Sequence, residues 1–65
     1  MKIYEYGIIK KDLWIDESTY GVAVSQARSF SIGREEKVHV RTWDQKKETF
    51  IWLDCFQDGR ELKCK

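Results

Sequence analysis

The residues best suited to acid–base chemistry are few, and the single histidine, His39, is the first to consider. The strand register developed below places His39 beside Asp54, and a carboxylate next to a histidine is the pairing that orients a general base. No serine falls near this pair, and Cys55 is predicted to point to the opposite face of the sheet. We therefore expect a surface ion pair here, no catalytic residues and no enzyme activity.

Other residue groups that often form catalytic, phosphate-binding or metal-binding sites are also absent from the sequence. The acidic pairs at 16–17 and 35–36 fall at the ends of predicted elements, where solvated loop charges are usual, so they do not resemble a glycosidase pair. The four glycines are scattered and form no phosphate-binding loop. Cys55 and Cys64 lack metal-ligand spacing. We expect no metal and no cofactor.

The two cysteines also bear on the cellular compartment. The sequence begins without a basic segment followed by an apolar one, and no apolar run approaches 18 residues, so neither a signal peptide nor a membrane span is predicted. A cytoplasmic location follows, where thiols stay reduced. Cys55 and Cys64 are then expected to be small buried apolar residues. A disulfide is disfavoured because the predicted register sets them diagonally.

Size and charge limit the class of protein. A chain of 65 residues, of which 42% are apolar and 14% aromatic, forms one domain, 1–65, with one thin core. That is too small for the two-lobed cleft of most enzymes. With 12 basic and 11 acidic side chains, the net charge is +1. Generic phosphate binders carry a larger basic excess.

The elements that position these residues can be predicted from periodicity. Residues 2–9, 13–17, 38–43, 49–56 and 60–64 have the β-rich composition or the alternation of strands. Residues 18–33 have a helical apolar stripe, with Ser18 as N-cap and Gly33 just after the end. A rival interpretation makes residues 19–24 a strand and starts the helix after Ser25. The fold class is α+β, with the order β-β-α-β-β-β: an antiparallel sheet of four or five strands with one helix packed on one face.

Two turns fix the register of the last strands. A four-residue loop at 45–48 sets Asp44 opposite Thr49, and a two-residue loop at Asp58-Gly59 sets Gln57 opposite Arg60. Because side chains alternate, one face should meet the helix; it comprises Val38, Val40, Thr42, Ile51, Leu53, Cys55, Leu62 and Cys64. The other face should be open; it comprises His39, Arg41, Trp43, Phe50, Trp52, Asp54 and Phe56, and is extended by Glu61 and Lys63.

The open face has two interpretations. Contiguous exposed aromatic residues indicate an interaction site, and tryptophan and arginine are enriched at binding hot spots. Alternatively, Arg41 over Trp52 and the aromatic cross-strand pairs only stabilise the sheet, with Tyr4, Tyr6 or Trp14 covering part of the face. The patch also suits a homodimer interface. Lys46 and Lys47, at a hairpin tip, are candidates for phosphate contacts, although polar tips also serve solubility.

The chain resembles a known family through two motifs. The helix carries Ser25-Gln26-Ala27-Arg28, and the chain ends in Gln57-Asp58-Gly59-Arg60-Glu61-Leu62-Lys63-Cys64-Lys65. With the β-rich start and the Trp/Phe-rich hairpin, this layout is similar to small phage-borne anti-CRISPR proteins of type I-F. The resemblance implies binding to the backbone subunits of an RNA-guided surveillance complex, in the channel where target DNA pairs with the guide. It implies contact roles for Arg28 and Arg60. Residues 10–14 depart from the family's layout.

These observations lead to a functional hypothesis. We expect a non-catalytic phage or mobile-element inhibitor that acts in the cytoplasm of a bacterial host and binds a host protein or ribonucleoprotein complex. The alternative is a nucleic-acid-binding module whose sheet stacks bases on aromatic rings. The predicted partner-binding residues are Arg28, Arg60, Arg41, Trp43, Phe50, Trp52, Lys46 and Lys47.

Overall fold

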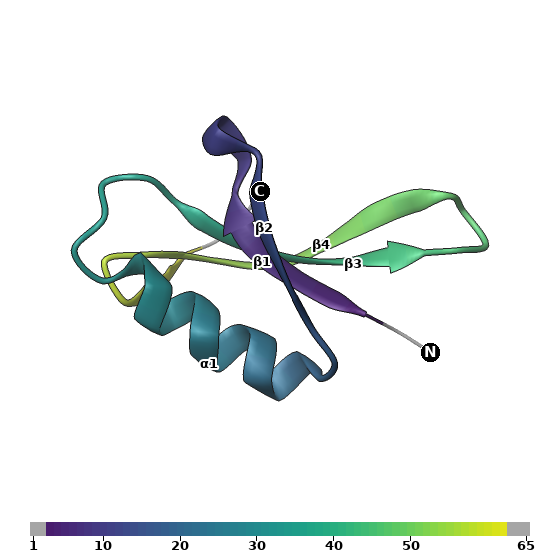
Figure 1. Cartoon of the computed structure of the whole chain (residues 1–65), viewed down its shortest axis with the longest axis horizontal. Helices are drawn as coiled ribbons and strands as arrows, with labels where there is room; N and C mark the ends of the chain where they lie inside the picture. Colours follow the sequence, from purple (N-terminus) through teal and green to yellow (C-terminus); the bar gives the residue numbers. More distant parts are fainter. Residues whose placement is uncertain (1–2, 63–65) are drawn as a thin grey trace.

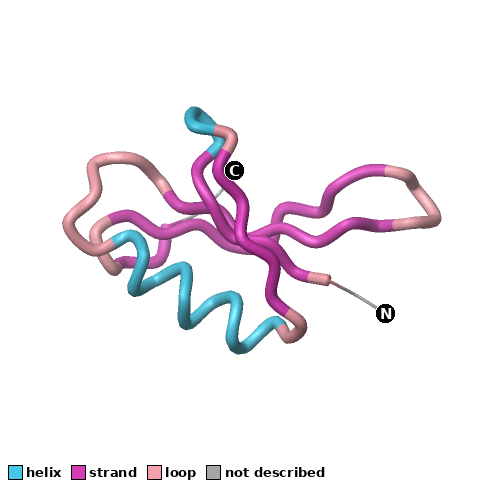
Figure 2. The backbone as a smooth tube through the Cα atoms, in the orientation of Figure 1, coloured by secondary structure: helices cyan, strands magenta, loops and turns pink. Residues whose placement is uncertain are grey.

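The computed structural model describes residues 3–62 and confirms the predicted α+β architecture. The chain forms β1 (Tyr4–Ile8), a short 3-10 turn (Ile9–Lys11), β2 (Leu13–Glu17) and α1 (Tyr20–Ser31), followed by β3 (Val38–Asp44), β4 (Thr49–Gln57) and β5 (Arg60–Leu62). The five strands make one antiparallel sheet in the order β2-β1-β3-β4-β5. Figure 1 shows α1 along one side of the sheet, and Figure 2 shows the β3–β4 hairpin projecting beyond the end of the helix.

The helix begins at a cap that differs by one residue from the predicted one. Thr19, not Ser18, has the extended backbone of an N-cap, and its hydroxyl accepts a hydrogen bond from the Val22 N–H at 3.3 Å. The rival interpretation with a strand at 19–24 is wrong. At the other end Gly33 follows the last cap residue with a φ of 78°, as predicted for a left-handed terminating residue.

The core lies between α1 and the sheet face beneath it, which we call the helix-side face. Ala23 and Ala27 are fully buried, and their small side chains allow the helix to lie close to the strands. Tyr6 stands opposite Val40 on the neighbouring strand and packs edge-on against Phe30, with ring centroids 5.9 Å apart. The buried apolar cluster comprises Tyr6, Ile8, Ala23, Ala27, Val38, Val40 and Phe56.

The strand register matches the prediction as far as Arg41 and then shifts. Asp44 lies opposite Thr49 and Thr42 opposite Ile51, as the four-residue loop requires. Beyond the Arg41–Trp52 pair, however, a β-bulge makes Leu53 an extra residue, so that Val40 faces Asp54. In a bulge, two residues of one strand face a single residue of the other. Counting residues from a turn with strict alternation of side chains cannot detect it.

The bulge exchanges the faces of the residues that follow it. Val38 lies opposite Phe56 and His39 opposite Cys55, which corrects the predicted Val38–Cys55 and His39–Asp54 neighbours. Phe56, predicted on the open face, is fully buried in the core. Cys55 moves to the outer face, still opposite Leu62 as predicted. Burying phenylalanine under the helix removes more apolar area from water than burying cysteine would, and this favours the bulged register.

Cys55 corrects a second expectation. It is buried and disulfide-bonded, whereas the sequence predicted two reduced thiols. The chain's only other cysteine, Cys64, lies outside the described residues, as does the predicted strand beyond Leu62. Disulfides are rare in cytosolic proteins, so the cytoplasmic location remains a proposal.

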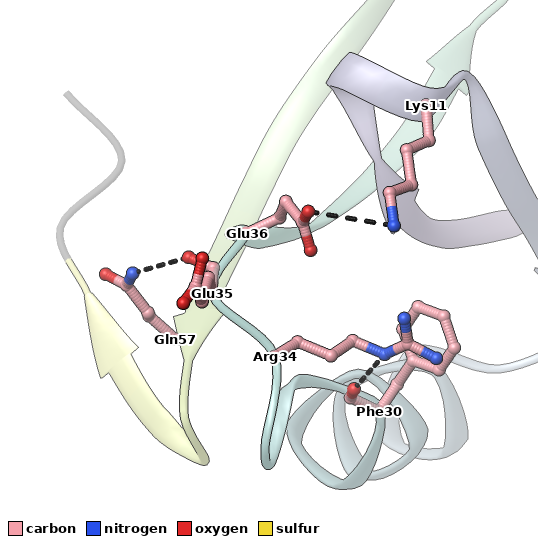
Figure 3. A network of polar contacts seen from close by, with 6 residues as sticks. All are labelled: Lys11, Phe30, Arg34, Glu35, Glu36 and Gln57. Atoms are coloured by element: carbon pink, nitrogen blue, oxygen red, sulfur yellow. Dashed lines mark hydrogen bonds and ion pairs between the residues drawn. The ribbon is translucent and has the colours of Figure 1, made fainter.

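The connection from α1 to β3 is held by contacts to three other parts of the chain (Figure 3). Arg34 donates from Nε to the Phe30 carbonyl at 2.9 Å, and its guanidinium lies 4.0 Å from the centre of the Phe30 ring. Gln57 donates to the Glu35 carbonyl at 2.9 Å. Lys11 Nζ and Glu36 Oε2 are 3.6 Å apart. These contacts fix the point at which β3 enters the sheet.

Candidate binding surface

The sheet face away from α1, which we call the outer face, is organised around Arg41. Its guanidinium carbon lies 3.6 Å from the centre of the Trp14 ring and 3.7 Å from that of Phe50, with Trp52 at 5.5 Å. Arg41 Nε donates to Glu5 Oε1 at 2.7 Å. The Arg41 side chain is only 15% exposed. Its charge is therefore already balanced inside the domain by a carboxylate and by aromatic rings.

Aromatic rings continue from Arg41 towards the tip of the β3–β4 hairpin. Trp43 and Phe50 are cross-strand partners with ring centroids 5.0 Å apart, and Phe50 lies 6.4 Å from Trp52. On the other side, Trp52 contacts Trp14 at 6.0 Å and His39 at 5.8 Å. Trp43 and Trp52 remain 46% and 45% exposed. The rings thus form one contiguous surface with two half-exposed tryptophans.

Two further residues belong to this surface: Trp14, one of three residues considered as covers of the face, and Glu5, which the sequence argument did not consider. Gly7 lies opposite Trp14, and a Cβ on Gly7 would meet the Leu13 carbonyl oxygen at 1.8 Å and the Trp14 ring at 2.9 Å. The glycine allows the β1–β2 hairpin to bring Trp14 over Arg41. A glycine in mid-strand signals such a close approach, and this was the available clue. Of the residues considered as covers, Trp14 is on the outer face, whereas Tyr6 packs in the core.

The predicted His39–Asp54 pair does not form, because the two side chains lie on opposite faces. His39 packs against Trp52 on the outer face, where burial, with a smaller effect of Lys37, lowers its pKa. Asp54 lies on the helix-side face and accepts a hydrogen bond from the Tyr20 hydroxyl. That bond, with burial and the Asp54 charge, raises the pKa of Tyr20 to about 12. The pair ties α1 to β4 and has a structural role.

The remaining predicted contact residues are dispersed. Lys46 and Lys47 lie in the β3–β4 turn, where their backbone N–H groups donate to Asp44 Oδ1 at 3.0 and 3.4 Å. Both residues are exposed, and Lys46 lines a hollow together with Trp43. The hairpin tip therefore joins basic and aromatic groups, as the nucleic-acid alternative requires.

Arg28 and Arg60 do not share a face. Arg28, in the last turn of α1, lies 5.5 Å from the centre of the Phe56 ring on the helix side. Arg60 stands opposite Gln57, whose side chain alternates with that of Phe56. Both arginines are exposed. The structure therefore separates the two residues that the family resemblance groups together.

Two hollows adjoin these surfaces. One, of about 460 Å³, lies beside the α1–β3 connection and includes Lys10, Lys37, Glu35 and His39 in its lining. The other, of about 530 Å³, lies along the projecting hairpin from Ile3 and Ile51 to the turn residue Lys46. Residues 3–62 contain no cluster of three or more histidine, cysteine or acidic side chains suited to a metal ion.

Comparison with known proteins adds no relative: no family model, curated protein or solved structure matches this chain. Among residues 3–62, the structure has no helix with the length and apolar character needed to cross a membrane. The functional argument therefore rests on the surfaces described above.

Proposed function

We propose that this protein is a non-catalytic binding domain whose outer face docks on a macromolecular partner. The observation that carries the proposal is the pair of half-exposed tryptophans, Trp43 and Trp52, 46% and 45% exposed, on either side of Phe50. Packing explains the inner part of the cluster, around Arg41, but burial in the domain leaves both indole rings in contact with water. Large aromatic side chains in such patches supply much of the binding energy at protein interfaces.

The charges of the outer face favour a protein surface over a phosphate backbone as the contact. The guanidinium of Arg41 is engaged by Glu5, so it has little capacity left for a phosphate. At the hairpin tip Lys46 and Lys47 are accompanied by Asp44 and Glu48, so the local charge is near balance. Nucleic-acid binding without sequence preference depends on unpaired cations along the groove.

Following the family resemblance, the proposed partner is an RNA-guided surveillance complex of a bacterial host, and the proposed role is inhibition of target DNA binding by a phage or mobile element. In this proposal the protein acts in the host cytoplasm. Arg28 and Arg60 are the contacts that the resemblance favours. Because they lie on different faces, at most one of them borders the outer-face interface, and Arg60 is that residue.

The experiment is a binding assay with a purified type I-F surveillance complex immobilised on a biosensor. Submicromolar binding that is lost when the complex is pre-loaded with target DNA would support both the partner and the blocking role. No binding at 10 µM, roughly the weak limit for a specific inhibitor, would reject this partner. A second type of complex, purified in the same way, is the control for nonspecific adhesion of aromatic surfaces.

The alternative function is binding of single-stranded nucleic acid, which the proximity of Lys46 and Lys47 to Trp43 favours. Stacking of bases on Trp43 and Trp52 would quench tryptophan fluorescence, and binding would weaken with added salt. Titration with single-stranded oligonucleotides at low and high salt tests it. Unchanged fluorescence at low salt would eliminate this alternative and leave the protein-binding proposal in place.

A further inference from the structure

The hollow of about 460 Å³ lies at the end of the sheet where β1 and β4 finish and β3 begins. Ile8 and Ile9 line it from the end of β1, His39 from the start of β3, and Gln57 from the end of β4. Its volume falls within the roughly 300–1,000 Å³ that is usual for small-molecule sites. The hollow is therefore large enough to hold a small ligand.

The charges around this hollow have a cationic excess. Within the described part of the chain, the ammonium groups of Lys10 and Lys37 make no hydrogen bond and no ion pair. Of the two acids in the lining, Glu36 lies 3.6 Å from Lys11, so its charge is already balanced (Figure 3). Glu35 is the other acid. Three lysines against two glutamates leave a net charge of +1, which favours an anionic ligand.

Two further groups in the lining define the ligand more closely. Ile9 is 52% exposed and offers an apolar surface beside the lysines. His39 is partly buried, and this burial, with a smaller effect of Lys37, lowers its pKa, so the imidazole is neutral at pH 7. A neutral imidazole can donate its N–H to an anion. An anion also stabilises the imidazolium form, so binding favours protonation of His39.

The other groups near His39 leave this coupling to the hollow. On the same face of β3, the charge of Arg41 is paired with Glu5. Cys55, which lies opposite His39 on β4, is disulfide-bonded and has no thiol to titrate. The charged residues of the lining are Lys10, Glu35, Glu36 and Lys37.

We propose that this hollow binds a small organic anion, whose phosphate, sulfonate or carboxylate group contacts Lys10, Lys37 and His39 and whose apolar part packs on Ile9. The site goes beyond the proposed function and does not depend on it, because neither Trp43 nor Trp52 lines the hollow. By linkage, protonation of His39 strengthens anion binding by the same factor by which the anion favours protonation.

Proton NMR of the histidine ring tests the proposal. His39 is the only histidine of the chain, so its ring C–H signals report on the hollow without overlap from another histidine. Benzenesulfonate, which stays ionised between about pH 5 and pH 8, where histidine titrates, is the probe. Neutral benzenesulfonamide is its matched control. The signals should move saturably with benzenesulfonate, with a dissociation constant of about 1 mM or below, and should not move with benzenesulfonamide.

The coupling gives a second readout. At saturation with benzenesulfonate the pKa of His39 should rise by about 0.5 or more, so that binding is about threefold or more tighter at pH 5 than at pH 8. An unchanged His39 pKa at saturation would place the anion elsewhere and overturn the proposal. So would equal binding of benzenesulfonamide, or a shift that stays linear up to about 10 mM probe.

A pair of variants separates the site from the overall charge of the protein. Lys37→Gln should weaken benzenesulfonate binding about threefold or more, as for loss of a good exposed ion pair. Arg34→Gln removes the same charge from the same connection, but Arg34 stacks on Phe30 and does not line the hollow. It should change binding by less than about 1.5-fold. Both residues are exposed, so both variants should fold, which circular dichroism checks. Equal losses in the two folded variants would overturn the proposal.

Discussion

Replacing Arg41 by methionine tests whether the contacts of the Arg41 side chain on the outer face stabilise the fold. Methionine keeps an unbranched side chain between Trp14 and Phe50 but removes the charge, the hydrogen bond to Glu5 and the contacts of the guanidinium with the rings. Arg41 and Glu5 side chains are 15% and 23% exposed. The pair is therefore shielded from solvent more than a surface ion pair, and its loss leaves the Glu5 carboxylate without this partner.

The expected loss can be assembled from these contacts. A hydrogen bond to a charged group contributes about 1.5–3 kcal/mol. Partly desolvated cation–π contacts add about 1–2 kcal/mol. Methionine recovers some of this through packing, so Arg41→Met should lower the free energy of unfolding by about 2–4 kcal/mol. That is a large part of the roughly 5 kcal/mol at the lower end of the range for small domains.

Urea denaturation followed by circular dichroism measures this loss, and a double-mutant cycle with Glu5→Gln isolates the ion pair. We expect a coupling energy of about 1–2 kcal/mol between the two sites. Arg34→Met is the matched control, because Arg34 is exposed and stacks on Phe30 at 4.0 Å with only a backbone carbonyl as acceptor. Its loss should be about 1 kcal/mol or less. If Arg41→Met costs under about 0.5 kcal/mol, the value of an ordinary surface substitution, the contacts of Arg41 with Glu5 and the aromatic rings do not stabilise the fold.

Two further predictions concern the parts that hold the sheet and the helix together. Gly7→Ala should destabilise the fold strongly, or prevent folding, because its Cβ would lie 1.8 Å from the Leu13 carbonyl oxygen; Gly21→Ala, in the helix with open space around it, should stabilise by up to about 1 kcal/mol in the same thermal-melting assay. The opposite ranking would contradict the close approach at Gly7. The raised pKa of Tyr20, about 12, means that the folded state favours the protonated phenol. Its stabilising contribution is complete below the unfolded value of 10.0 and is lost as pH rises towards 12. Tyr20→Phe should remove this alkaline loss, and an unchanged pH profile would contradict the Tyr20–Asp54 contact.

The fold could be predicted largely from local patterns. The hairpin loops, the helix and the fold class follow from turn residues, capping and periodicity, which act over a few residues. The predicted register of β3 and β4 is wrong only beyond the Arg41–Trp52 pair, because the position of a bulge depends on which side chains fit under the helix. Here the bulge allows Phe56 to pack with Val38 in the core cluster. This tertiary preference has no local signature in the alternation of β4.

The candidate site was predicted in part. Arg41, Trp43, Phe50 and Trp52 lie on the outer face as expected, because they precede the bulge or lie within the matching register. Trp14 was only one of three candidate covers of this face and Glu5 was not considered, because nothing in a single sequence fixes how β1 and β2 join the later strands. The same register shift that buries Phe56 places Asp54, the predicted partner of His39, on the opposite face of the sheet.

The most direct test of the outer-face proposal compares two variants in the surveillance-complex assay. Trp52→Ala removes a half-exposed ring from the outer face, whereas Arg28→Ala changes the exposed arginine on the helix side. If the outer face is the contact, Trp52→Ala should weaken binding about 30-fold or more, as expected for a hot-spot tryptophan, and Arg28→Ala should change it by less than about threefold. Loss of binding in Arg28→Ala with full affinity in Trp52→Ala would contradict the proposal and place the contact on the helix side.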